Sequence, residues 1–151
     1  MDIKDVIETV NDLIENCKDG EYGFRRCGER VERSDLKQVM NQRADDCQRA
    51  ASELQTLVSQ LGGTPETTGT ALGAMHRGWV SVRDAVSGDS DLAVLEECER
   101  GEDAALERYR SALEQALPPH VRSIVERQYE GVKRNHQQVR SLRDQLRMAK
   151  A

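Results

Sequence analysis

The stretch that decides the fold is LEECERGEDAALERYRSALEQAL, residues 95–117. Its apolar side chains recur every three or four residues, the spacing of one helix face; they are Leu95, Cys98, Ala105, Tyr109, Ala112 and Ala116. Glu102 falls on the same face, seven residues after Leu95 and seven before Tyr109. Because a buried charge without a partner costs several kcal/mol, this carboxyl group needs polar neighbours. The pattern predicts a long helix whose companions each bring a polar residue to the height of Glu102.

The composition predicts an all-α protein. Charged residues make up 32% of the 151 residues and aromatic residues only 3%, so aliphatic and sulfur-containing side chains must form the core. That mixture favours packed helices over a β-sandwich. The three prolines, Pro65, Pro118 and Pro119, leave three long stretches free of the strongest helix breaker. The length is that of one domain spanning residues 1–151.

Helical periodicity and turn residues give the expected element boundaries. We predict a four-helix bundle with helices at about residues 2–32, 35–61, 90–117 and 120–148, and a shorter helix at about 70–86. The second helix is expected to begin at Ser34 or Asp35 and to end at Gly62-Gly63. The segment before residue 90 is longer than a tight turn needs. It therefore predicts a crossover that carries the short helix and leaves its two flanking helices parallel.

Polar residues gather toward the middle of the predicted bundle. The candidate metal ligands are Glu21, Asp46, Glu99, Glu102 and His136. Carboxylates with one imidazole suit iron or manganese, and two carboxylates can bridge two such ions. These residues give one hypothesis, a di-iron or di-manganese protein with oxidase-like or peroxidase-like activity. The Glu-x-x-His motif of the usual di-metal bundle is absent, however, so the ligand set is small.

The competing interpretation is a buried hydrogen-bonded layer that fixes the helix register. In that case a basic residue would neutralise Glu21 or Glu102, and Gln128 or His136 would satisfy the remaining lone pairs. The basic candidates are Arg43, Arg49, Lys133 and Arg134. The missing motif favours this interpretation over the metal site. No nucleophile–base pair, phosphate-binding glycine loop or zinc spacing is recognisable, so no catalytic residue is assigned.

The four cysteines are expected to be thiols in the core. Cys17, Cys27, Cys47 and Cys98 lie on apolar helix faces and form no CxxC pair. Free cysteine behaves as a small hydrophobe in such positions. In a reducing compartment, core thiols are favoured over a disulfide or a thiolate metal site.

Charge and hydropathy exclude two classes of partner. The net charge is -5 and basic residues form no continuous stripe, which argues against nucleic-acid binding. No apolar run is long enough to span a bilayer, and the N-terminus lacks the apolar region of a signal peptide. We therefore expect a cytoplasmic protein that binds neither nucleic acid nor membrane.

Four segments resemble a known family: LIENCKDGEYGF at residues 13–24, LGGTPETTGTALGAMHRGW at 61–79, LEECERGEDAALERYRSAL at 95–113 and VERQYEGVKRNHQQVRSLRD at 125–144. They are similar to the PA2169-type bundle family, also called DUF2383, a bacterial family of the ferritin-like superfamily. The resemblance implies a four-helix bundle with a left-handed crossover and implies little about activity. Ferritin-like relatives bind two irons, but their ligand motif is not matched here.

These observations lead to two expectations for function. The first is an uncharacterised, non-catalytic bundle with a stress-linked or assembly role, which self-associates through its surface helices into a homo-oligomer. The second is the di-iron or di-manganese protein described above.

Overall fold

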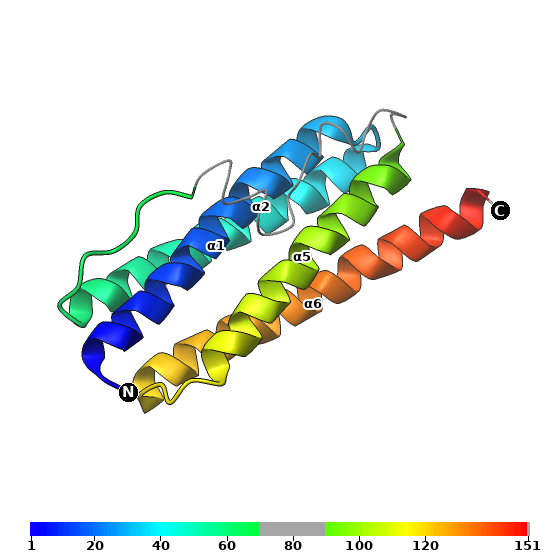
Figure 1. Ribbon diagram of the computed structural model, residues 1–151. Coiled ribbons are helices and arrows are strands. Elements are labelled where there is room, and N and C mark those ends of the chain that lie inside the picture. The colour runs from blue at the N-terminus through cyan, green and yellow to red at the C-terminus, as the bar shows by residue number, and fades with distance from the viewer. Residues whose placement is uncertain (70–89, 151) are drawn as a thin grey trace.

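A computed structural model describes residues 1–69 and 90–150, and in that part of the chain all regular structure is α-helical. Its helices are α1 (Ile3–Arg30), α2 (Ser34–Gln60), α5 (Asp91–Leu113) and α6 (Pro119–Lys150). They pack into an elongated bundle (Figure 1). The all-α fold class and the bundle are therefore confirmed.

The bundle consists of two antiparallel hairpins. α1 pairs with α2 through a short turn, and α5 pairs with α6 in the same way. Because α2 ends at one end of the bundle and α5 begins at the other, these two helices run in the same direction (Figure 1). This is the predicted topology with one long crossover, which ferritin-like bundles share. Membership of the ferritin-like superfamily stays a prediction.

The first part of the crossover lies along α1. Gly62 follows the last turn of α2 with a φ of 86°, the left-handed conformation that glycine adopts most easily. Asn11 then holds the chain at two points: its Nδ2 donates to the carbonyl of Thr64 at 3.1 Å, and its Oδ1 accepts from the amide of Glu66 at 2.9 Å. Further on, Gly69 lies against Asp19. The predicted helix at residues 70–86 lies outside the described residues.

Helix ends differ from the prediction by a few residues. α5 ends at Leu113, whereas periodicity predicted an end near residue 117. Pro118 and Pro119 explain the earlier stop, because neither has the backbone N–H that the carbonyls of Glu114 and Gln115 would need in a continuing helix. Arg122 Nη2 then donates to the carbonyls of Leu113 at 2.9 Å and Gln115 at 2.6 Å, which satisfies both groups at the helix end.

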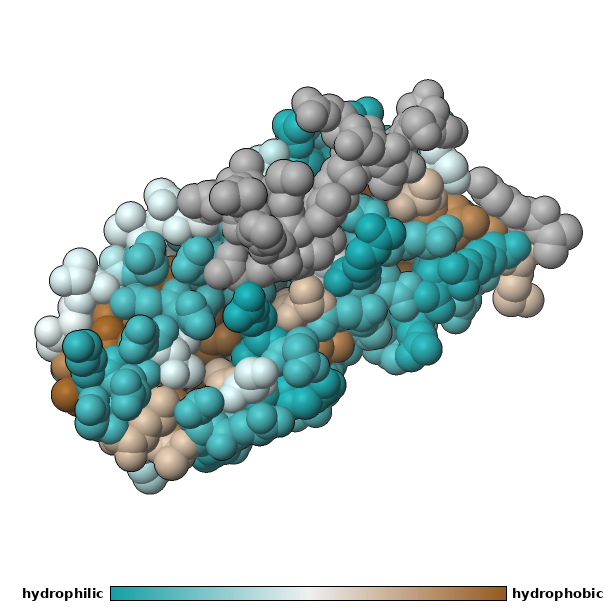
Figure 2. Space-filling view, viewed as in Figure 1, coloured by the Kyte–Doolittle hydropathy of each residue, from teal (hydrophilic) through white to brown (hydrophobic). Residues whose placement is uncertain are grey.

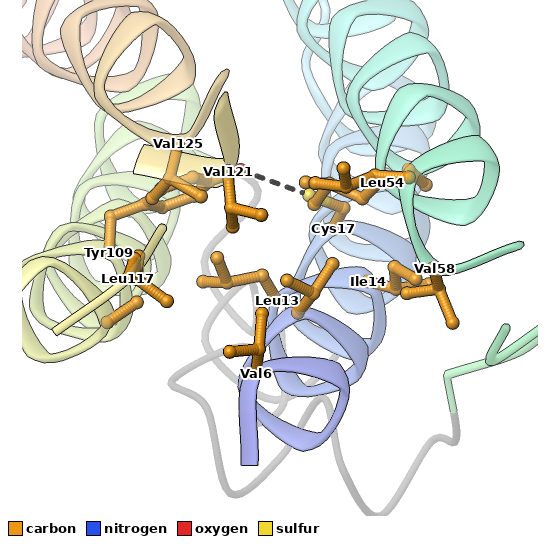
Figure 3. Packing of buried hydrophobic residues seen from close by; sticks show 14 residues of the cluster. Val6, Leu13, Ile14, Cys17, Leu54, Val58, Tyr109, Leu117, Val121 and Val125 are labelled. Atoms are coloured by element: carbon orange, nitrogen blue, oxygen red, sulfur yellow. Dashed lines mark hydrogen bonds between the residues drawn. The ribbon is translucent and has the colours of Figure 1, made fainter. Parts of the chain in front are cut away.

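The hydrophobic core is divided into two clusters at different heights of the bundle. One cluster joins the first half of α1, the second half of α2, the end of α5 and the start of α6. Figure 3 shows its side chains converging from the two hairpins, with Leu13 between Ile14 and Val58 on one side and Val121 and Val125 on the other. The other cluster joins the second half of α1, the first half of α2, the start of α5 and the second half of α6. The fully buried residue that α6 contributes to it is Val139. The space between the clusters is where polar residues can enter.

The described surface is mainly hydrophilic. Figure 2 shows hydrophobic residues in small separate areas of the visible face and not in one continuous patch. The large hydrophobic side chains that are exposed are Met1, Ile3, Tyr22 and Met148. Within the described residues, no helix has the length and apolar character needed to cross a membrane.

The cysteine prediction is correct for two residues and wrong for the other two. Cys17 and Cys47 are free thiols. Cys27 of α1 and Cys98 of α5 pair as a disulfide, with Cα atoms 7.0 Å apart. No local pattern indicates this pair, because the two residues are 71 positions apart and meet only where α1 packs on α5.

Candidate functional site

A cavity of about 720 Å³ lies between the two hairpins, and all four described helices contribute to its wall. Its lining residues come from both core clusters and from the polar layer between them. The apolar part of the wall includes Phe24, Ala50, Ala105, Tyr109 and Val132. Its volume and mainly apolar lining are typical of a pocket for a small organic molecule.

Unequal helix packing and small residues explain the position of the cavity. α1 packs closely on α2 and α5, and α5 on α6, whereas α2 and α6 have few contacts. Glycine or alanine occupies a lining position on every helix, at Gly20, Ala50, Ala105 and Gly131. At Gly20 the helices approach closely, because an added Cβ would lie 3.1 Å from the Sγ of Cys47.

Glu102 is the least satisfied polar residue on the cavity wall. Its side chain is 3% exposed, and its Oε1 has no hydrogen-bond partner within the described residues. Burial raises the pKa of Glu102 to about 8, and the nearby charge of Arg43 offsets only part of that rise. At neutral pH the group is therefore mainly a protonated carboxylic acid.

A second polar group on the wall forms a complete hydrogen-bonded chain. The hydroxyl of Tyr109 donates to Oε1 of Gln128 at 2.9 Å, so the thiol of Cys17, 3.3 Å away, donates to the hydroxyl. Gln128 Nε2 then donates to Glu53 Oε1 at 2.7 Å. Burial raises the pKa of Cys17 to about 11, which keeps it a thiol. This chain links all four helices and leaves none of its buried atoms unpaired.

Arginines surround the cavity, and two of them are already paired. Arg49 forms an ion pair with Asp46, and Arg127 forms one with Glu53. The Arg127–Glu53 pair connects α6 to α2 on the side where those helices separate. Both arginine side chains are more than half exposed, so water screens their charges.

The structure brings four of the five predicted site residues into one electrostatic environment. Burial raises the pKa of Cys47 well above its usual value. Neighbouring carboxylates raise it further; they are Glu102, Asp46 and Glu21. Glu99 in turn raises the pKa of Glu102. The expectation that acidic residues meet near the middle of the bundle therefore agrees with the structure.

Three of the five predicted site residues also form ion pairs or hydrogen bonds with other side chains. Asp46 accepts from Arg43 at 3.2 Å and also pairs with Arg49. Glu99 pairs with Arg143 of α6. His136 Nε2 lies 2.6 Å from Oδ1 of Asp103, an exposed residue. These partners divide the acidic group among several ion pairs.

These residues do not fit a di-metal centre. In residues 1–69 and 90–150, no three histidine, cysteine, aspartate or glutamate side chains are placed so that they could hold a metal ion. Asp46 is already paired with Arg43, and Glu99 with Arg143, so the charges of these carboxylates are neutralised by arginine. Iron or manganese binding stays a prediction from the sequence and from the family resemblance.

The hydrogen-bonded layer has different members from those expected. Arg43 and Arg49 neutralise Asp46 and form no hydrogen bond with Glu102. Gln128 bonds to Tyr109 and Glu53. Oε1 of Glu102 is therefore left without a partner in the described residues. Glu53, Arg127 and Asn16 were not identified as site residues. The signal available for them was weak, because charged residues on a helix flank normally face water.

A family model described as "Domain of unknown function (DUF2383)" matches residues 5–115 of the chain. The match covers most of the chain. The chain belongs to the DUF2383 family. No curated protein matches it. The matched part of this DUF2383 protein contains α1, α2 and α5. It therefore includes Glu102 and the part of the cavity wall that these three helices form. The wall from α6, including Gln128 and Arg127, lies beyond the match.

Proposed function

We propose that this protein is a non-catalytic binding bundle, a carrier or sensor that holds a small organic molecule between its two hairpins. The observation that carries the proposal is the unpaired carboxyl oxygen of Glu102 on the wall of a cavity of about 720 Å³. A buried polar atom without a partner costs about 1–3 kcal/mol. A ligand that bonds to Glu102 would recover this energy.

The chemistry of the polar groups on the described cavity wall supports a binding role. The thiols of Cys17 and Cys47 both have pKa values raised by burial, which opposes formation of the nucleophilic thiolate. Tyr109 is held in a hydrogen bond to Gln128, and its pKa is also raised well above normal by burial. The polar groups on the described wall are therefore suited to hydrogen bonding more than to bond making.

A thermal-shift experiment tests binding with three ligands that share one apolar body: phenylbutylamine, phenylbutanol and phenylbutyrate. At least one should raise the midpoint of unfolding of the full chain, because a ligand that binds only the folded state stabilises it. The matched control is Ala105→Leu, which fills part of the cavity and should remove the shift. The proposal is wrong if no ligand shifts the midpoint, or if the control responds as strongly as the natural chain.

A role in stress or assembly and a homo-oligomeric state remain part of the proposal. A sensor needs a surface that reports occupancy, and self-association is the simplest such output. Light scattering of the purified chain, with and without the ligand that gives the largest thermal shift, measures this directly. A strictly monomeric protein under both conditions would contradict self-association and leave the binding proposal intact.

The di-iron or di-manganese alternative is tested separately. Elemental analysis after expression in iron- and manganese-supplemented medium should find metal well below one ion per chain. Stoichiometric metal that is lost in Glu102→Ala would instead favour the metalloprotein.

A further inference from the structure

The ligand class follows from the charges inside the cavity. Three titratable groups on its wall, Cys47, Tyr109 and Glu102, have pKa values raised mainly by burial; Cys17 adds to the rise at Cys47 and Tyr109, and carboxylates add to it at all three. Glu53 contributes this effect at Tyr109, and Asp103 and Glu99 contribute it at Glu102. Burial opposes any isolated charge, whereas the carboxylates oppose only a negative one, so a positive charge that pairs with Glu102 is better accommodated than a negative charge.

The arginines around the cavity do not reverse this preference. Arg49 and Arg127 are neutralised by Asp46 and Glu53. Arg134 is exposed, so its charge is screened by water. Arg43 is the cation whose charge acts most on Glu102, but it pairs with Asp46, and its Nε has no hydrogen-bond partner in the described part of the chain.

Two polar side chains on the wall suit an ammonium group. Glu102 offers an unpaired carboxyl oxygen, and Asn16, which is 6% exposed, offers an amide oxygen on the same cavity. Both can accept hydrogen bonds from an N–H donor. The aromatic rings of Phe24 and Tyr109 and the side chain of Val132 complete a wall that can surround an apolar body.

We propose that the cavity binds an organic amine with an apolar body, whose ammonium group donates to Glu102 and Asn16. This inference rests on the proposed binding function and names its ligand class. Binding exchanges one proton: the carboxyl group of Glu102 releases its proton to solvent and becomes a carboxylate, while the amine stays protonated. No covalent bond forms or breaks in the ligand. Because Glu102 is buried, the resulting charge pair is stronger than the same pair in water.

The charged and titratable groups around Glu102 come from every helix. The list is Cys17 and Glu21 on α1, Arg43, Asp46 and Cys47 on α2, Glu99, Asp103 and Tyr109 on α5, and Arg134 and His136 on α6. His136 acts through Asp103, with which it shares a hydrogen bond. Because Cys47 and Tyr109 have pKa values well above neutral, Glu102 is the cavity group that can release a proton near pH 7.

Isothermal titration calorimetry tests the inference on the full chain with phenylbutylamine as the probe. Titrations at pH 7 in phosphate and in Tris separate the heat of binding from the heat of buffer protonation. With a pKa of about 8, roughly nine in ten Glu102 carboxyls hold a proton at pH 7, so binding should release close to one proton. Affinity should rise as the pH increases from about 6 to 8, because the carboxylate becomes easier to form.

Glu102→Gln should weaken phenylbutylamine binding at least tenfold and remove the proton release. The matched control is Glu97→Gln. Glu97 is also a buried glutamate on α5, but it pairs with Arg100 and does not line the cavity. This control should bind the amine as the natural chain does. Circular dichroism confirms that both variants are folded.

The possible results separate the inference from the function on which it rests. If phenylbutanol or phenylbutyrate binds more tightly than the amine, or if amine binding releases no proton, the amine inference is overturned while the binding function stands. If none of the three compounds binds, both are overturned.

Discussion

At the scale of single residues, Glu102 shows how burial changes chemistry. A glutamate normally ionises near pH 4.5, and in this chain burial moves the pKa to about 8. Between these values the folded protein holds a proton that the unfolded chain releases. The free energy of unfolding therefore falls as the pH rises through this interval.

Removing this titration should change how stability depends on pH. Between pH 5 and pH 8, Glu102→Gln should gain stability relative to the natural chain, by on the order of a few kcal/mol, because glutamine has no proton to lose. Urea denaturation at several pH values measures the difference. Glu29→Gln, at an exposed site of α1, is the control and should follow the natural pH profile. A constant difference between Glu102→Gln and the natural chain would contradict the raised pKa.

Tyr109 gives a second prediction at this scale. Tyr109→Phe removes the hydroxyl that joins Cys17 to Gln128 and leaves a buried amide oxygen unpaired. The expected cost is about 1–3 kcal/mol of unfolding free energy, measured by urea denaturation. Tyr22→Phe, at a 46% exposed residue, should change stability by less than about 0.5 kcal/mol. Equal effects of the two substitutions would show that the hydrogen-bonded chain contributes nothing.

At the scale of elements, glycine inside a helix indicates where packing or space overrides helix propensity. Gly20 has a packing reason, since an added methyl group would press on the sulfur of Cys47. Gly131 of α6 has no such contact, because its nearest neighbour would be the end of Arg134 at 3.7 Å. Gly131 lines the cavity, so space for a ligand explains it better than packing does.

The two glycines should therefore respond differently to alanine. Gly131→Ala should raise the free energy of unfolding by about 1 kcal/mol, the usual difference in helix propensity. Gly20→Ala should gain less or lose stability, since the Cys47 side chain must move. Thermal and urea denaturation of the two variants compare them. A larger gain at Gly20 than at Gly131 would contradict the packing described here.

At the scale of the whole molecule, the divided core makes α6 unequal along its length. Its first half supplies Val121 and Val125 to one cluster, while its second half supplies one fully buried residue, Val139, to the other. Leu142 and Leu146 are only partly buried. The Arg143–Glu99 ion pair adds a polar connection between the second half and α5.

Hydrogen exchange should reveal this inequality. Backbone amides after residue 140 should exchange faster than those between residues 121 and 132, because fewer buried contacts oppose local opening. Mass spectrometry of the full chain measures both segments in one experiment, with α1 as an internal reference of high protection. Equal protection along α6 would contradict the division of the core.

The sequence by itself determined the helices, their order and the acidic middle of the bundle. Apolar spacing, the proline turn and the glycine pair act locally, so residues close in the chain carry that information. It also indicated that Glu102 is buried, since the residue interrupts an apolar face. The same pattern placed Gln128 inside, which the structure confirms.

Only the tertiary structure decided which residues meet. Glu53 pairs with Arg127, and Cys27 pairs with Cys98. Arg43 forms its ion pair with Asp46, and Oε1 of Glu102 is left without a hydrogen bond. Partner choice depends on helix rotation and on the spacing between helices, which one-dimensional periodicity does not contain. The position of the cavity also depends on the spacing between helices, because the cavity lies where α2 and α6 have few contacts. No single segment of the sequence indicates it.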